Sequence, residues 1–157
     1  MMRQRLSFIL IAIAIFLIPV RLKAAEDPFT GVWTLVLSES TLPPPIPKSQ
    51  FVRIKADAKH IHIREKVMTG DHASMEVSVA AKFDGQEYPV KGSPYADTVI
   101  YDRVDSHTIK GIAKKAGKIV SNETAVISED GRAMTVTYNT TDRSGKMLTA
   151  IAVFRRP

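Results

Sequence analysis

Residues 50–68 read QFVRIKADAKHIHIREKVM, and two parts of this stretch alternate between apolar and polar side chains. Segment 51–56 has aliphatic residues at positions 52, 54 and 56 and basic residues at 53 and 55. Segment 60–64 repeats the pattern, with isoleucine at 61 and 63. Successive side chains of a β-strand point to opposite faces, so each segment predicts a strand with one apolar and one wet face.

The same short-period pattern continues along the chain, and no window has apolar residues at helical spacing over three turns. Ten strands are predicted. They span 31–37, 50–57, 60–68, 74–83, 87–91, 97–104, 107–114, 118–128, 133–141 and 147–155.

The connections between these segments predict hairpins. Glycine follows Asp84, Ala116, Asp130 and Ser144, and it adopts the positive φ of tight turns without strain. The exception is the proline-rich segment 41–47, which we interpret as a stiff connection across one end of the sheet. A meander of strands that each have one apolar face removes its exposed edge strands when the sheet closes into a barrel. The predicted fold is therefore all-β: a mainly antiparallel barrel of eight to ten strands, with an immunoglobulin-type sandwich as the alternative.

The N-terminus predicts export. Arg3 and Arg5 precede an apolar run of fifteen residues, 6–20, and small residues follow at Ala24 and Ala25. An uncleaved anchor is the alternative, but a membrane-spanning helix needs about 20 apolar residues. We predict a signal peptide over residues 1–24, a domain over 25–157, and a periplasmic or secreted protein without a membrane span.

The net charge and the absence of cysteine limit the classes of partner and of side-chain chemistry. Four of the 22 basic residues lie in the predicted signal peptide, which leaves 18 against 16 acidic residues, a net charge of +2. We therefore do not expect nucleic acid to be a partner. Cysteine is absent, so disulfides and thiolate chemistry are excluded, and an exported chain without cysteine is more typical of bacteria.

Three further segments are FTGVWTLVLS at 29–38, DGQEYPVKGSPYADT at 84–98 and AVFRR at 152–156. Together they resemble the calycin superfamily, which comprises lipocalins and fatty-acid-binding proteins, and especially its small exported bacterial lipocalin-like domains. The resemblance implies a lipocalin-like barrel whose floor is closed by Gly31 and Trp33. It also implies that an arginine near the chain end, Arg155 or the adjacent Arg156, covers the indole.

The resemblance also directs the search for a ligand site. Fatty-acid-binding proteins hold a carboxylate with Arg-x-Tyr on the last strand, where this chain has Ala152 and Phe154, so a fatty acid is not expected. Three polar residues alternate in step with the apolar residues of their strands and should therefore point into the barrel: Tyr101, Arg103 and Tyr138. We predict that they bind the ligand, with Arg103 orienting an anionic head group. Alternatively, Arg103 lies on the surface and the tyrosines fill the core.

Motifs for catalysis are missing from the sequence. It has no Gly-x-Ser-x-Gly elbow and no glycine-rich phosphate loop before a helix. His60 and His62 share a strand face with Arg64, whose charge opposes a bound cation, so no metal or cofactor is expected. We expect a non-enzymatic binding protein for a small hydrophobic or amphipathic ligand. The alternative is a structural or envelope-interaction barrel filled by its own side chains.

Overall fold

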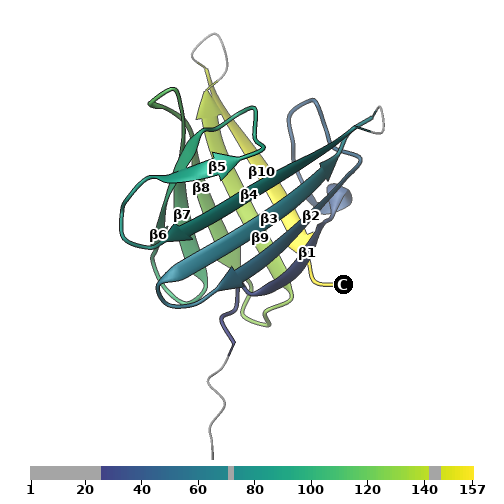
Figure 1. The fold of residues 1–157 in the computed structure, drawn as a ribbon. Helices are drawn as coiled ribbons and strands as arrows, with labels where there is room; N and C mark the ends of the chain where they lie inside the picture. Colours follow the sequence, from purple (N-terminus) through teal and green to yellow (C-terminus); the bar gives the residue numbers. More distant parts are fainter. Residues whose placement is uncertain (1–25, 71–72, 142–145) are drawn as a thin grey trace, which may run out of the picture.

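The computed structural model describes residues 26–70, 73–141 and 146–157. The predicted signal peptide and the predicted turn at 144–145 lie outside these ranges. No helix within the described ranges is long and apolar enough to cross a membrane. The described chain contains ten strands and one 3-10 helix, η1 (Leu37–Glu39), and its first residues lie below the barrel in Figure 1.

All ten predicted strands are present, and each strand end lies within two residues of its expected position. The strands are β1 (Gly31–Leu35), β2 (Ser49–Ala56), β3 (His60–Met68), β4 (Ser74–Lys82), β5 (Tyr88–Lys91), β6 (Thr98–Arg103), β7 (Thr108–Lys115), β8 (Lys118–Ile127), β9 (Ala133–Thr141) and β10 (Met147–Arg155). Every strand pairs antiparallel with its neighbours in sequence, so the predicted meander is confirmed.

The sheet closes into a barrel because β1 pairs with β10 (Figure 1). This pairing is short, with Leu35 opposite Phe154, but the chain beyond β1 continues to bond β10. The Val36 N–H donates to the Val153 carbonyl at 2.8 Å, and Thr41 forms a bridge with Ile151. Closure leaves the strands of the described chain without a free edge, so the barrel prediction is confirmed and the sandwich alternative is wrong.

A glycine allows the short strand β5 to join the barrel. Gly92 follows β5 with a φ of +81°, and a Cβ built on it would lie 1.9 Å from the Glu76 carbonyl oxygen of β4. Any side chain there would collide with backbone, which has no freedom to move aside. The position after β5 therefore requires glycine for both its conformation and its contact with β4.

The segment before β1 enters the barrel at its lower end in Figure 1. The largest fully buried side chains are Phe29, Trp33, Ile61 and Phe154. Along β8 and β9 the inward-facing side chains then change character with distance from this end. They pass from Ile127 and Met134, both buried, to Glu123 and Tyr138, which are half-buried. One end of the barrel is thus closed by apolar packing, and polar groups begin in the interior beyond it.

Candidate ligand-binding site in the barrel interior

A row of inward-facing residues crosses five neighbouring strands, β6 to β10. In order, each opposite the next, it contains Tyr101, Gly111, Glu123, Tyr138 and Ala150. The two small residues leave room for the three large polar ones. A Cβ on Gly111 would lie 3.0 Å from Tyr101 Cε1 and 3.4 Å from Glu123 Oε2. Glycine thus lets both side chains fold over the β7 backbone inside the barrel.

A second carboxyl group enters the interior from the other side of the barrel. Glu65 lies on β3 between Val52 and Val77 of the adjacent strands, at the same strand parity as Ile61 and Ile63. Its Oε1 accepts a hydrogen bond of 2.5 Å from Gln50 Nε2 on β2. The alternation that places isoleucine inside therefore also places this glutamate inside.

The two carboxyls and the two tyrosines form one electrostatic cluster. Burial raises the pKa of Glu123 to about 7, and the Glu65 carboxylate adds to this shift. Burial also raises the pKa of Glu65, although the hydrogen bond from Gln50 opposes the change. The pKa values of Tyr101 and Tyr138 are raised well above 10, first by burial and then by the charges of Glu123 and Glu65. The interior therefore favours positive charge or hydrogen-bond donors over anions.

The structure brings Tyr101 and Tyr138 together with this cluster, but it places Arg103 elsewhere. Arg103 Nη2 lies 2.7 Å from Asp27 Oδ2, and the two side chains are only 14% and 11% exposed. The guanidinium also lies 4.8 Å from the ring centroid of Phe83 and 5.6 Å from that of Phe29. Arg103 is thus largely buried, and its guanidinium is paired with Asp27 at the closed end.

The floor contains the expected indole, but the cation that covers it is Arg156. Trp33 is fully buried, its Nε1–H donates to the Phe29 carbonyl at 2.9 Å, and the Arg156 guanidinium lies 4.4 Å from the ring centroid. Gly31, with a φ of +152°, makes room, since a Cβ there would lie 2.7 Å from Arg156 Nη1. Arg156 also donates to three carbonyls of this end, those of Pro28, Thr30 and Gly131.

The assignment of Arg155 to the floor is corrected by strand alternation. Phe154 points inward at the end of β10, so Arg155 points outward. There its Nη2 lies 2.8 Å from Glu39 Oε2, on the barrel surface. The next residue, Arg156, lies beyond the end of β10 and is not constrained by strand alternation, so its side chain can turn under the indole.

The sequence interpretation missed three polar residues of the interior, the two glutamates that carry its charge and the glutamine that bonds one of them. Gln50, Glu65 and Glu123 all lie on the apolar side of their strands, the same signal that led to Tyr101 and Tyr138. A search for polar residues at apolar parity in all ten strands would have found them.

Comparisons with known proteins add a fold likeness. No protein-family model matches the sequence, and no curated protein matches it. Among solved structures, apocrustacyanin C2 is 13% identical, with a TM-score of 0.49, and lobster apocrustacyanin A1 is 15% identical, with a TM-score of 0.47. Each match covers 83% of this chain and 62% of the other chain, so this chain spans less than two thirds of their length. The architecture of this chain, a closed antiparallel barrel, is established by its own strand pairing.

Proposed function

We propose that this chain is an exported, non-enzymatic binding protein for a small amphipathic ligand whose polar end is cationic or rich in hydrogen-bond donors. The observation that supports the ligand class is the pair of interior carboxyls, Glu65 and Glu123. Within the described residues, the one arginine that points inward from a strand, Arg103, is already paired with Asp27. A ligand amine would supply the missing countercharge.

The rest of the interior suits the apolar part of such a ligand. Aliphatic side chains from strands on both sides of the barrel form the buried core, among them Val52, Val79, Val99 and Val136. Small-molecule sites are typically apolar with a few convergent polar groups. Tyr101 and Tyr138 would add phenol hydroxyls beside Glu123, so the polar end of the ligand would meet up to four side chains at one place.

A chain-matched pair of amphiphiles tests the proposal. Dodecylamine and dodecanoate would be titrated into the protein at pH 8, where Glu123 is ionised, with isothermal calorimetry as the readout. A charge-assisted hydrogen bond to a buried carboxylate predicts a preference of about 10-fold or more for the amine. Glu123→Gln should remove most of this preference, whereas Glu129→Gln, an exposed carboxyl in the β8–β9 hairpin, should preserve it. Equal binding of both amphiphiles, or preference for the carboxylate, contradicts the ligand class.

The second candidate is a structural module whose interior is filled by its own side chains. The tight packing of Phe29, Trp33 and Phe154 at the closed end favours it. Native mass spectrometry of the protein purified from its own host separates the two, because a binding protein should retain a small molecule and a filled module should not. The same sample tests export, since cleavage after Ala24 predicts Ala25 as the first residue.

A further inference from the structure

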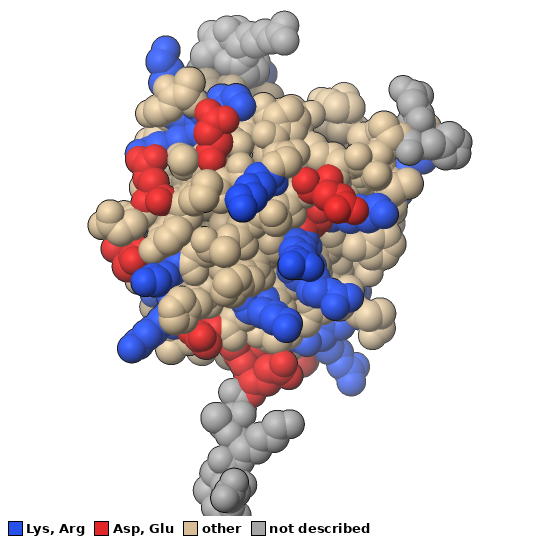
Figure 2. Space-filling model, viewed as in Figure 1, with Lys and Arg blue, Asp and Glu red and all other residues tan. Residues whose placement is uncertain are grey.

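The outer face of one half of the barrel is strongly basic, although the predicted mature chain is nearly neutral. The outward-facing positions of β2 to β5 carry six basic residues and a single acidic one, Glu76. The basic residues are Arg53, Lys55, Arg64, Lys66, Lys82 and Lys91. We call this surface the basic face. Strands β2 to β5 face the viewer in Figure 1, and the same view in Figure 2 shows Lys and Arg side chains over them.

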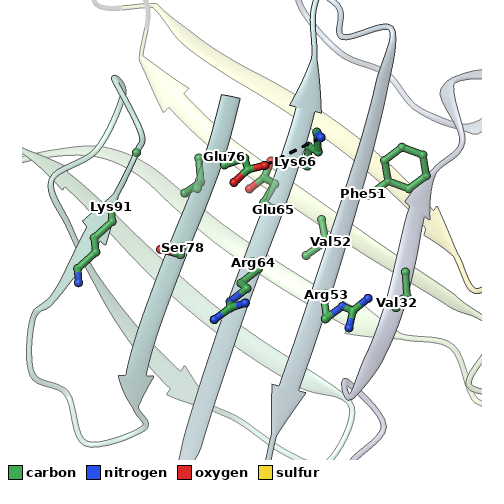
Figure 3. Close-up of a pocket in the computed structure, with 12 residues that line it drawn as sticks. Val32, Phe51, Val52, Arg53, Arg64, Glu65, Lys66, Glu76, Ser78 and Lys91 are labelled. Carbon is green, nitrogen blue, oxygen red and sulfur yellow. Dashed lines mark ion pairs between the residues drawn. The ribbon is translucent and has the colours of Figure 1, made fainter. Parts of the chain in front are cut away.

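The centre of the basic face is a row of residues that oppose one another across β2 to β5. Arg53 lies opposite Arg64, Arg64 opposite Ser78, and Ser78 opposite Lys91. These four residues line a surface hollow, in which Figure 3 shows Arg53, Arg64 and Lys91 extending from neighbouring strands. Like charges directly opposite on paired strands destabilise a sheet. The arrangement is therefore a cost to the free protein that an external anion would remove.

Several basic residues elsewhere on the barrel have acidic partners, although Lys110 and Lys118 have none within ion-pair distance in the described chain. Lys114 pairs with Glu87, Lys115 with Asp97, and Arg155 with Glu39. On the basic face, by comparison, the ion pair found among described residues joins Lys66 to Glu76 at 4.0 Å. Arg53 and Arg64 have no acidic group within ion-pair distance in the described chain.

Two exposed apolar side chains lie at the edge of the same hollow. Phe51 is 43% exposed and Val32 is 37% exposed, and they lie opposite Lys66 and Arg53 respectively. An aromatic ring within a basic field suits a surface that offers both anionic groups and apolar material. The outer side of a lipid bilayer does so, with phosphates at the surface and acyl chains beneath.

We propose that the basic face docks on an anionic phospholipid bilayer, with lipid phosphates in the hollow at Arg53 and Arg64 and with Phe51 at the interface. The extent of the charge favours a bilayer over a single free phosphate. Four strands spaced about 4.8 Å apart spread the cations over about 14 Å, which requires several anionic groups side by side. This site lies on the outer face of the barrel, although Glu65 and Glu76 are also among the residues that line the hollow.

Co-sedimentation with vesicles tests the proposal. Vesicles of phosphatidylglycerol and phosphatidylcholine in equal amounts should bind the protein, and pure phosphatidylcholine vesicles should bind it much less. The difference should shrink as salt is raised, because the Debye length falls from about 10 Å at 0.1 M to about 3 Å at 1 M. Equal binding to both kinds of vesicle would overturn the proposal.

Matched variants locate the contact. Each basic residue near an anionic membrane contributes about fivefold to partitioning, so Arg53→Gln with Arg64→Gln should weaken binding about 30-fold. Lys110→Gln with Lys118→Gln removes the same charge from exposed positions on β7 and β8 and should change binding only a few-fold. A similar loss in both double variants would mean that net charge, and not this face, drives binding, which overturns the proposal. An unchanged melting temperature for the arginine variant would show that it remains folded.

Two competitors distinguish other anions from the bilayer. If inorganic phosphate displaces the protein from vesicles more strongly than sodium chloride of the same ionic strength, the hollow is a discrete phosphate site and the bilayer assignment is wrong. If a single-stranded oligonucleotide binds the basic face more tightly than the anionic vesicles do, nucleic acid is the partner instead. Phe51→Ser should weaken vesicle binding without altering phosphate displacement.

Discussion

Replacing Glu123 with glutamine should raise the stability of the ligand-free protein at alkaline pH. Burial raises the pKa of this carboxyl from an ordinary value of 4.5 to about 7. Both states are protonated below 4.5, only the unfolded state is ionised between the two values, and both are ionised above 7. Stability is therefore full at low pH and is lost as the pH rises through about 7.

The magnitude of this loss follows from the two pKa values. The interval between 4.5 and about 7 corresponds to about 3 kcal/mol of unfolding free energy. That is a large share of the 5–15 kcal/mol by which domains are typically stable. Burial also raises the pKa of Glu65, so its ionisation should lower the stability of the protein further as the pH rises. Wild-type protein should therefore be markedly less stable at pH 8 than at pH 5.

Urea denaturation at pH 5, 6, 7 and 8 measures the effect. Glu123→Gln should flatten the dependence by about 2–3 kcal/mol over this range and should be more stable than wild type at pH 8. Glu129→Gln, at an exposed hairpin position, should retain the wild-type dependence. If Glu123→Gln follows the wild-type curve, the carboxyl is solvated, and the argument for a low-dielectric interior that selects amines is refuted.

Three further variants test the closed end of the barrel. Trp33→Ala should lower the unfolding free energy by about 3–5 kcal/mol, because it leaves a large cavity beneath the floor, and a urea midpoint equal to that of wild type would contradict this role. Arg156→Met should lower the unfolding free energy by about 1–2 kcal/mol through the lost cation-π contact and carbonyl hydrogen bonds. Arg155→Met should leave the melting temperature nearly unchanged. The reverse order would return Arg155 to the barrel floor. Arg103→Ala should lower the unfolding free energy by about 3 kcal/mol, because Asp27 stays buried without its partner. It should leave the uptake of an anionic hydrophobic probe unchanged. Weakened uptake in a stable variant would return Arg103 to the ligand site.

The tyrosines show how far strand parity predicts the interior. Tyr101 and Tyr138 could be placed inside because each lies two residues from a buried valine of its strand, Val99 and Val136 respectively. Parity is a local property, so it also places Arg103 on the inward side. It does not say at what height along the barrel a side chain lies, and for Arg103 that height decides between ligand binding and floor packing.

The sequence by itself determined the ten strands, their wet and apolar faces and their order around the sheet, because alternation and turn glycines act between residues close in the chain. Only the tertiary structure decided which charges meet. Closing β1 on β10 brings Glu65 of β3 and Glu123 of β8 into one interior, Asp27 beside Arg103, and Arg156 beneath Trp33. Charges interact through space and depend on burial, so groups far apart in the chain acquire their partners, their pKa values and their roles only when the barrel is complete.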